Sequence, residues 1–342
     1  MRAFIIGVAE TALTDRERAF LREAQPWGLI LFKRNVAGPE ALRKLIDDVR
    51  SALGREAPVL IDQEGGRVQR LGPPHWPIYP PGAAYGVLYD RDREIGLAAA
   101  RLGARLIAAD LTTLGIDVDC MPVADVPVAG ADSVIGDRAY GRAPEKVAAI
   151  ADAIAQGLAE GGVLPVVKHI PGHGRATADS HNVLPVVNAD RATLETTDFA
   201  AFRRLAALPL AMTAHVVFTA IDPVAPATVS TTIVRDVIRG SIGFNGLLMS
   251  DDISMGALSG SIDERARAAI AAGCDLVLHC NGDMSEMLAV AAEAPLLAAE
   301  AARRAAAALA MKRPPVPIDI AARRAEFLSL MVGAWQPAQG LA

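Results

Sequence analysis

Short apolar runs recur along the chain and are separated by longer, mixed segments. Each run is nearly continuous in Val, Ile and Leu, as expected for parallel strands that are buried on both faces. The runs predict eight strands, over Ala3–Val8, Gly28–Phe32, Pro58–Asp62, Asp117–Met121, Leu164–Lys168, Leu210–Thr213, Leu247–Ser250 and Leu276–His279.

Between these runs, apolar positions recur at three- and four-residue spacing, which is the pattern of helices with one buried face. Many of these positions are alanine, which has the highest intrinsic helix propensity. The pattern predicts helices over Asp15–Glu23, Pro39–Leu53, Arg93–Leu114, Pro144–Glu160, Arg191–Leu205, Thr231–Ile238, Ser261–Ala272 and Met284–Ala292.

The regular alternation of strand and helix favours a parallel sheet. Eight strands, each followed by a helix, predict an α/β fold consisting of a single (β/α)8 barrel of the TIM type. The competing architecture is an open doubly wound sheet, which usually carries a glycine-rich phosphate turn after its first strand. The segment GVAETAL at residues 7–13 is not such a turn.

The domain organisation follows from the absence of any linker. The chain has 342 residues, and no segment rich in Gly, Ser or Pro divides it. We expect residues 1–342 to form one barrel domain, with closing helices and a tail over about 293–342. The segment Lys312–Asp319 is expected to join a short C-terminal extension and not a second domain.

Polar residues stand where the apolar strands end. Asp62 stands at the end of one predicted strand, and Lys168 and His169 stand at the end of another. Thr213 and His215 follow a third strand, and Asp251 and Asp252 follow a fourth. The carboxyl ends of barrel strands converge on one face, where barrel enzymes build their sites from different loops. We therefore expect one site assembled from residues that are far apart in sequence.

Composition excludes several classes of function. The formal net charge of −5 is spread along the chain, and no basic patch suggests a nucleic-acid partner. The N-terminal apolar stretch is too short for a signal peptide, and the longest apolar run, Leu205–Ile221, is too short and too broken to span a bilayer. Cys120, Cys274 and Cys280 show no paired spacing, which favours reduced thiols in a cytoplasmic protein.

The segment KHIPGHGRATADSH, Lys168–His181, places a lysine, three histidines and an aspartate on one long loop. Asp179 and His181 are two positions apart, so an extended loop brings them to one side, where the carboxylate can accept the imidazole N–H. The other ring nitrogen is then available for proton transfer. A metal site is the alternative interpretation, but neither H-x-x-x-H on a helix nor H-x-H at a strand end is present. His173 is expected to structure the loop.

The segment LLMSDDISMGAL, Leu247–Leu258, ends a buried strand in two carboxylates. Neighbouring strand residues point to opposite faces, so only one of Asp251 and Asp252 should face the barrel mouth. Helix capping is the alternative role, and it suits Asp252 or Ser254 better than it suits two acids in succession.

The segment IDQEGGRVQRL, Ile61–Leu71, combines a strand-end acid with two arginines. Asp62 can accept hydrogen bonds from two hydroxyl groups of a ligand, and Arg70 can donate to other ligand groups. For Arg67, a surface salt bridge is the expected role.

Five motifs stand in a fixed order along the chain: IDQEGGRVQRL, VIGDRAYG, KHIPGHGRATADSH, MTAHVVF and SDDISMGAL. In this order and spacing they resemble glycoside hydrolase family 3, and more closely its single-domain bacterial β-N-acetylglucosaminidases of peptidoglycan recycling. The resemblance runs from about Ile30 to Leu278. The chain has Ile170 where the family commonly shows Phe, and Ala139-Tyr140 where it often shows Ser-Phe, and neither change removes a reacting group.

The resemblance implies a role for each matching residue. Asp251 matches the nucleophile, and His181 matches the general acid/base with Asp179 as its partner. The residues that match those holding the terminal N-acetylglucosamine are Asp62, Arg70, Arg138, Lys168 and His169. Two-domain β-glucosidases of the family lack the histidine loop, so this loop favours the N-acetylglucosaminidase activity.

The resemblance implies a retaining exo-hydrolase that needs no cofactor and no metal. Its expected substrates are small carbohydrates such as N-acetylglucosaminyl-anhydromuramyl peptides, and we expect a cytoplasmic monomer without nucleic-acid or membrane partners. Three alternatives stay open at this point. They are a phosphorylase that uses phosphate in place of water, a non-catalytic sugar-binding barrel, and a mechanism in which the substrate's acetamido oxygen replaces the protein nucleophile.

Overall fold

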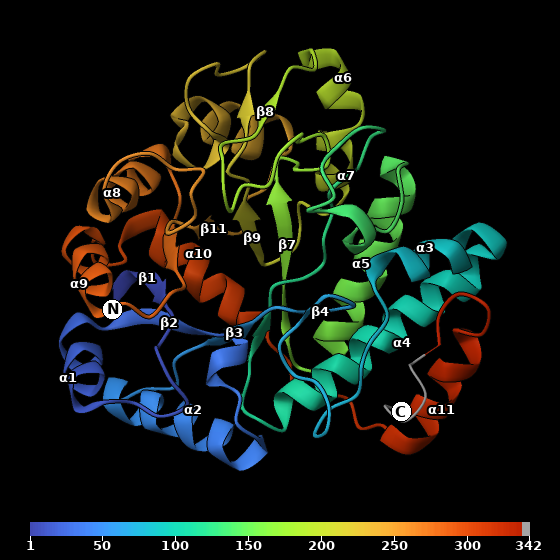
Figure 1. Ribbon diagram of the computed structural model, residues 1–342, viewed down its shortest axis with the longest axis horizontal. Coiled ribbons are helices and arrows are strands. Elements are labelled where there is room, and N and C mark those ends of the chain that lie inside the picture. Colours follow the sequence, from blue (N-terminus) through green and yellow to red (C-terminus); the bar gives the residue numbers. More distant parts are fainter. Residues whose placement is uncertain (337–342) are drawn as a thin grey trace.

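The computed structural model describes residues 1–336 and contains a closed barrel of eight parallel strands (Figure 1). The strands are β1 (Arg2–Ile6), β2 (Pro26–Leu31), β3 (Val59–Ile61), β6 (Val118–Asp119), β7 (Leu164–Ile170), β9 (Leu210–Thr213), β11 (Leu247–Asp252) and β12 (Leu276–His279). Around the barrel they follow the order β1-β12-β11-β9-β7-β6-β3-β2, which is the sequence order closed on itself. The predicted (β/α)8 barrel is confirmed, and each predicted strand overlaps an observed one.

Both faces of each strand are buried, because one faces the barrel interior and the other faces the helices. In β3, Leu60 belongs to the interior cluster, whereas its neighbours Val59 and Ile61 pack toward the helices. The same alternation separates Val166 from Val167 in β7. This two-sided burial is the reason that the strands read as continuous apolar runs.

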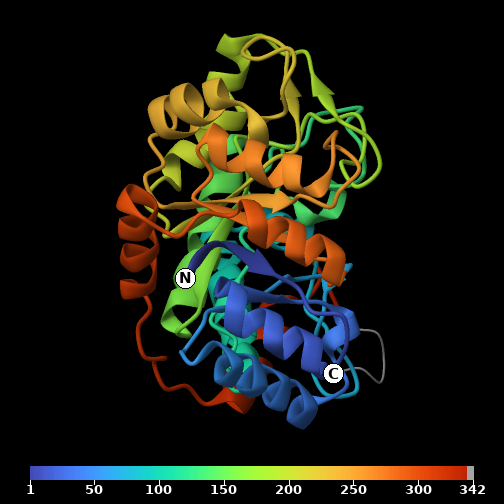
Figure 2. The same cartoon turned by 90° about the vertical axis from the view of Figure 1, so that its left-hand side faces the viewer.

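The helices lie outside the barrel, as Figure 2 also shows. Six predicted helices have observed counterparts: α1 (Asp15–Ala24), α2 (Pro39–Leu53), α4 (Arg93–Thr112), α5 (Pro144–Glu160), α8 (Ile262–Ala272) and α9 (Met284–Glu293). The helix predicted over residues 231–238 is a π-helix, η4 (Ile233–Ser241).

The single helix predicted over residues 191–205 is wrong, because Thr197 interrupts it. The structure has α6 (Arg191–Thr196) and α7 (Asp198–Arg204) instead. At this break, the hydroxyl of Thr197 and the carboxylate of Asp198 accept hydrogen bonds from Arg175, at 2.9 and 2.6 Å. Because Arg175 belongs to the histidine loop, the break between α6 and α7 is the point at which these helices hold that loop.

Helix α3 (Gly82–Arg91) has no counterpart among the predicted helices. Its sequence holds two glycines, which weaken the helical pattern. A Cβ atom at Gly82 would lie 2.1 Å from the carbonyl oxygen of Arg138, and one at Gly86 would lie 2.1 Å from that of Tyr140. The glycines therefore let α3 support the backbone that carries Arg138.

Smaller elements form the walls of the barrel mouth. A hairpin of β4 (Gln63–Gly65) and β5 (Val68–Gln69) follows β3, and β8 (Val186–Val187) pairs in parallel with β10 (Val217–Phe218). The remaining short helical turns are η1 (Lys33–Asn35), η2 (Gly136–Arg138) and η3 (Ala227–Val229). All of them belong to loops that leave the carboxyl ends of the strands.

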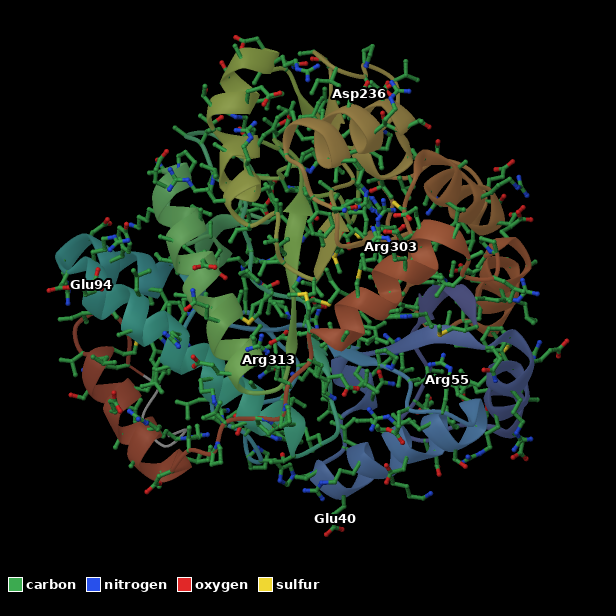
Figure 3. All side chains as sticks on the ribbon, turned by 180° about the vertical axis from the view of Figure 1, so that it is seen from behind. Glu40, Arg55, Glu94, Asp236, Arg303 and Arg313 are labelled. Atoms are coloured by element: carbon green, nitrogen blue, oxygen red, sulfur yellow. The ribbon has the colours of Figure 1, made fainter. Side chains whose placement is uncertain are left out.

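Two helices follow the barrel. Helix α10 (Ala299–Ala310) places Ala305 and Ala308 in the interior cluster. Figure 3 shows this helix, which carries Arg303, crossing one end of the barrel. Helix α11 (Ile320–Leu330) packs against α4. The last six residues of the predicted tail, 337–342, lie outside the described residues. Among residues 1–336, no helix has the length and apolarity needed to cross a membrane.

Phe327 anchors the C-terminal helix and gives a test of this packing. The side chain is 3% exposed, and its ring centroid lies 6.4 Å from Tyr79 and 6.5 Å from Tyr85. Phe327→Ala removes these contacts and leaves a cavity, so the free energy of unfolding should fall by ~3–5 kcal/mol in urea denaturation. Val332→Ala, at a position 61% exposed, should change it by less than ~0.5 kcal/mol. Equal effects of the two changes would show that α11 does not contribute to the core.

Candidate active site

A cavity of about 240 Å³ lies at the carboxyl ends of the barrel strands. Its apolar lining includes Phe32, Met212 and Leu278. All eight residues that the sequence assigned to a site line this one cavity, namely Asp62, Arg70, Arg138, Lys168, His169, Asp179, His181 and Asp251. The structure thus brings together residues from loops after β3, β6, β7 and β11.

Lys168 stands at the centre of a buried ionic network. Its ammonium group lies 2.7 Å from Asp62 and 2.7 Å from Glu64, and the residue is 2% exposed. Arg70 pairs with Asp62 at 2.9 Å, and Arg138 pairs with Glu64 at 2.8 Å. Each of the two carboxylates therefore joins Lys168 to one arginine.

The network keeps its acids ionised. Burial alone would raise the pKa of Asp62, but the charges of Lys168 and Arg70 outweigh it and lower this pKa far below its usual range. Burial would also raise the pKa of Glu64, and the charges of Arg138 and Lys168 instead lower it to about 2. Both carboxylates accept hydrogen bonds at neutral pH.

Glu64 received no role from the sequence. It belongs to the IDQEGG motif, two residues after Asp62, and it is 7% exposed. The spacing was the available signal, because alternate residues of an extended segment share a face. Its ion pairs with Arg138 and Lys168 could not be read from one motif, since the three residues come from three loops.

His169 is oriented by a second acid that the sequence analysis missed. The Nδ1 atom of His169 lies 2.7 Å from Asp125, a carboxylate with no exposed surface. Asp125 also accepts the backbone N–H groups of His169 and His173, at 3.3 and 2.6 Å. Burial opposes ionisation of Asp125, yet the neighbouring His169 lowers its pKa below the ordinary value. The acid fixes the ring and leaves Nε2 of His169 for a ligand.

Asp251 and Asp252 both line the cavity, which corrects the expectation that only one faces the mouth. The reason is an irregularity in the pairing of β11 with β12 between Met249 and Asp252, which breaks the alternation of faces. The two acids still differ in their bonds. The oxygens of Asp252 accept from Ser254 and from the N–H of Cys280, as the capping interpretation suggested. Within residues 1–336, only one oxygen of Asp251 accepts a hydrogen bond, from the N–H of Asp252 at 2.8 Å.

The backbone of Asp251 is tied to the strand beside it by a chain of hydrogen bonds. Its N–H donates to the hydroxyl of Thr213 at 3.3 Å, and that hydroxyl lies 2.7 Å from Thr228. Thr228 is 2.7 Å from Nδ1 of His215, whose Nε2 lies 2.9 Å from the carbonyl oxygen of Asp252. Burial lowers the pKa of His215, and its Nε2 donates in this bond, because a carbonyl oxygen can only accept. The MTAH segment therefore fixes the strand end that presents Asp251.

Asp251 is itself ionised. Burial opposes its charge, but the imidazoles of His215 and His169, the N–H of Asp252 and the ammonium of Lys168 together lower its pKa below the ordinary value. An ionised carboxylate with one oxygen unbonded is the protonation state that a nucleophile requires.

Asp179 and His181 form the predicted pair on the histidine loop. Nδ1 and the backbone N of His181 lie 2.7 and 2.9 Å from the same oxygen of Asp179. Burial would raise the pKa of Asp179, but these hydrogen bonds lower it, so its carboxylate is charged at neutral pH. The side chain of His181 is 65% exposed, which leaves its Nε2 accessible from the cavity.

His173 and Arg67 take the structural roles that their sequence context suggested. His173 is 3% exposed, its Nε2 lies 3.2 Å from the hydroxyl of Ser180, and burial lowers its pKa to about 4. Arg67 pairs with the exposed Asp137 at 3.0 Å and donates to the backbone of residues 133–135.

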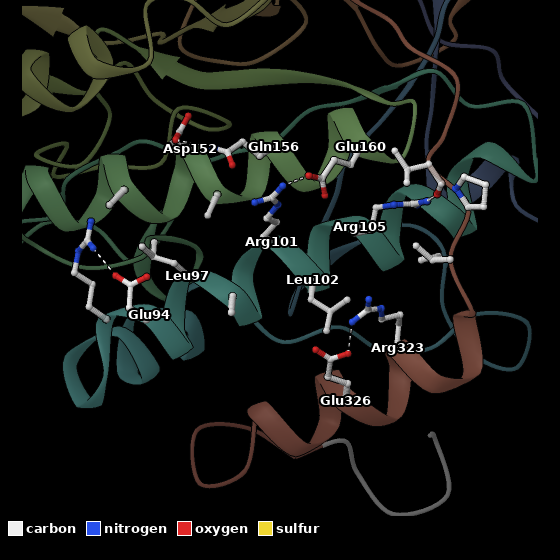
Figure 4. Close-up of a pocket in the computed structure, with 17 residues that line it drawn as sticks. Glu94, Leu97, Arg101, Leu102, Arg105, Asp152, Gln156, Glu160, Arg323 and Glu326 are labelled. Carbon is white, nitrogen blue, oxygen red and sulfur yellow. Dashed lines mark hydrogen bonds and ion pairs between the residues drawn. The ribbon is translucent and has the colours of Figure 1, made fainter.

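A larger cavity, about 780 Å³, lies outside the barrel between α4, α5 and the C-terminal segment (Figure 4). Its charged side chains pair with one another, as in Arg101 with Glu160 and Arg323 with Glu326. Paired charges on an outer groove offer no reacting group. Within residues 1–336, no set of three His, Cys, Asp or Glu side chains is arranged to hold a metal ion.

Glu64→Gln tests the ionic network. A carboxyl group whose pKa falls from 4.5 to about 2 on folding adds stability that is fully present above pH 4.5 and is lost as the pH falls toward 2. Breaking a buried pair should lower the free energy of unfolding by ~3–5 kcal/mol near pH 7. The variant should also lose part of the acid sensitivity that the wild type shows between about pH 5 and 3.

The matched control is Glu56→Gln, because the side chain of Glu56 is 86% exposed. This change should alter the free energy of unfolding by less than ~0.5 kcal/mol, both near pH 7 and at acid pH. Urea denaturation of the three proteins gives the answer. The network has no such role if Glu64→Gln and the wild type lose stability in parallel as the pH falls.

Known proteins with similar sequences cover most of this chain. A model of the glycosyl hydrolase family 3 N-terminal domain matches residues 5–309. The β-hexosaminidase of Alkalilimnicola ehrlichii is 42% identical over 283 residues, which cover 81% of this chain and 80% of that protein. The β-hexosaminidase of Chromobacterium violaceum is 39% identical, over 85% of this chain and 82% of that protein.

A similar solved structure is that of NagZ from Neisseria gonorrhoeae in complex with N-trifluoroacetyl-D-glucosamine. It superimposes with a TM-score of 0.84 at 32% sequence identity, and the match covers 97% of each chain. The family resemblance carried by the five motifs is confirmed by these matches. From the extent of the family match and from relatives near 40% identity, the chain belongs to glycosyl hydrolase family 3.

Proposed function

We propose that the protein is a retaining exo-β-N-acetylglucosaminidase that hydrolyses terminal N-acetylglucosamine from small peptidoglycan-derived fragments. The observation that carries this proposal is the presence of Asp251 and the Asp179–His181 pair on one cavity. Relatives of this chain are named β-hexosaminidases, and one similar structure holds an N-acylated glucosamine. A binding barrel would need the sugar-holding residues but not these reacting groups.

The ionic network suits one sugar ring. Asp62 offers carboxylate oxygens that Lys168 and Arg70 hold in place, so sugar hydroxyls meet acceptors that are already oriented. Arg138 lies on the same cavity, and Nε2 of His169 is left free for a hydrogen bond to the ligand. Because these residues surround one cavity of about 240 Å³, we expect it to hold a single terminal residue and not an internal one.

The reaction takes two displacements at the anomeric carbon. In the first, the free oxygen of Asp251 bonds to this carbon, and protonated His181 gives its proton to the departing glycosidic oxygen. In the second, neutral His181 takes a proton from water, the water oxygen bonds to the carbon, and the carboxylate of Asp251 leaves. Asp179 holds the ring and stabilises its charged form. Two inversions give net retention.

The bonds of the two adjacent acids favour Asp251 over the substrate's own acetamido oxygen as nucleophile. An acetamido mechanism needs a carboxylate that orients the amide. Asp252 is the neighbouring acid, and its oxygens are already occupied by Ser254 and the N–H of Cys280. Asp251 is ionised and keeps one oxygen for the sugar.

The natural substrates are proposed from size and compartment. Cys120, Cys274 and Cys280 are all free thiols, which suits the cytoplasm. There the enzyme acts as a monomer on imported or recycled fragments, such as N-acetylglucosaminyl-anhydromuramyl peptides, and not on intact polymeric wall.

His181→Ala should impair substrates according to their leaving groups. Loss of the proton donor should lower kcat/KM by ~10²–10⁴-fold for a disaccharide, whose leaving oxygen needs a proton. A nitrophenyl N-acetylglucosaminide has a leaving group that hardly needs one, so its kcat/KM should fall by less than about ten-fold. Steady-state kinetics on both substrates measures the difference.

Asp179→Asn is the companion variant, since Asp179 acts only through the histidine in this mechanism. It should show the same dependence on the leaving group in milder form. Equal losses on both substrates in a folded His181→Ala protein would make His181 a positioning residue and leave the proton donor to be found elsewhere.

A 5-fluoro N-acetylglucosaminyl donor should trap the covalent intermediate. The fluorine slows both displacements, but a reactive leaving group speeds the first, so the glycosyl-enzyme forms faster than it is hydrolysed. Mass spectrometry of the digested protein should place the sugar on a peptide with Asp251. Asp251→Asn should abolish labelling, whereas Asp252→Asn should retain it. Lack of any adduct, together with tight binding of a thiazoline inhibitor, would support the acetamido mechanism instead.

A further inference from the structure

The loop after β11 contacts the histidine loop through its backbone. The N–H of Gly256 donates to the carbonyl oxygen of His181 at 3.1 Å, and the N–H of Ala257 donates to that of Ser180 at 3.1 Å. The segment that begins with Asp251 therefore also holds the backbone of the acid/base. The mechanism above gives no role to this contact.

These two bonds join the tip of the histidine loop, residues 177–184, to the rest of the protein. Between residues 177 and 184, the other hydrogen bonds among the described residues stay within the histidine loop. They join Asp179 to His181, Asn182 and Val183, and Ser180 to His173. Internal bonds shape the tip, but they cannot fix its distance from Asp251.

The absence of a side chain at Gly256 is required by this contact and not by a turn. Its φ lies outside the left-handed region that favours glycine. A Cβ atom there would lie 2.8 Å from the carbonyl oxygen of Asn182 and 3.0 Å from that of His181. Any larger residue must push the histidine loop away, because both contacts are to backbone atoms.

The donor segment is itself held firmly. Arg265 of α8 donates to the carbonyl oxygens of Ile253 and Met255, at 2.8 and 3.1 Å. The carboxylate of Asp252 accepts the N–H and hydroxyl groups of Ser254, at 3.0 and 2.7 Å. The support is thus a braced turn between Asp251 and the tip of the other loop.

We propose that Gly256 is a positioning residue for the general acid/base, which sets the place of His181 through its N–H and its lack of a side chain. The inference rests on the proposed function, because it assigns Gly256 an effect on proton transfer alone. One segment then fixes the separation of the nucleophile and the proton donor, although these come from β11 and from the loop after β7.

Gly256→Ala should reproduce a weaker form of the loss seen on removal of the imidazole. Displacing a reacting group by about 1 Å can cost on the order of 10²-fold, so kcat/KM for a disaccharide should fall by ~10- to 100-fold. For the nitrophenyl glycoside it should fall by less than about three-fold, since that substrate needs only the sugar site and Asp251. Equal losses on both substrates, or no loss on either, would overturn the proposal.

Gly72→Ala is the matched control, because a Cβ atom at Gly72 would meet only the side chain of Gln69, at 3.8 Å. It should leave both rates unchanged. A double-mutant cycle with His181→Ala adds a readout that a general structural defect does not give. Gly256→Ala should cause no further loss in the His181→Ala background, and additive losses would show that Gly256 acts independently of the imidazole.

Amide hydrogen exchange in the wild type tests the contact even if Gly256→Ala fails to fold. The N–H of Gly260 makes no hydrogen bond within residues 1–336, so it serves as the internal reference. With 15N-glycine labelling, the Gly256 amide should exchange more slowly than that of Gly260, and equal exchange would overturn the proposal. If the wild type released no nitrophenol at all, the proposed function, on which this inference rests, would fail, whereas equal exchange in an active enzyme would overturn this inference alone.

Discussion

The buried ammonium group of Lys168 is the constraint on which the rest of the site depends. Moving a charged group out of water costs several kcal/mol, and this cost is offset only where oppositely charged groups lie in good geometry. Asp62 and Glu64 supply that geometry at 2.7 Å each, and Arg70 and Arg138 complete it. Loops after β3, β6 and β7 must therefore meet at fixed positions, and the acceptors for a sugar are oriented before it binds.

The two halves of the site are built differently. The sugar-binding half is a buried ionic network with little freedom, which suits recognition of one ring. The proton-transfer half lies on a loop, where the side chain of His181 is 65% exposed. A group that must be protonated in one step and neutral in the next benefits from contact with water, whereas the nucleophile benefits from the charged surroundings that keep Asp251 ionised. The turn at Gly256 links the segment of Asp251 to the loop of His181.

The sequence predicted the barrel from local patterns, and it predicted the eight cavity residues from strand ends, the spacing in the histidine loop and the family motifs. Strands buried on both faces are continuous apolar runs, and polar residues at their ends, such as Asp62 and Asp251, mark the face of the site. The family motifs then identified Arg138 and the Asp179–His181 pair, which periodicity alone does not distinguish.

The features that escaped prediction depend on partners distant in sequence. Glu64 and Asp125 are ordinary acids until the fold places Arg138 and His169 beside them. The break at Thr197 exists because Arg175 reaches it from another loop, and the irregular end of β11 arises from its pairing with β12. Helix α3 was missed because its glycines, which weaken the helical pattern, are needed for close packing.

The configuration of the first product tests the central claim most directly. Nitrophenyl N-acetyl-β-glucosaminide is hydrolysed in phosphate buffer inside an NMR tube, and spectra are recorded before the released sugar equilibrates between its anomers. Double displacement through Asp251, with water as the acceptor, predicts that β-N-acetylglucosamine appears first. Initial appearance of the α anomer, or of N-acetylglucosamine 1-phosphate, would contradict a retaining hydrolase.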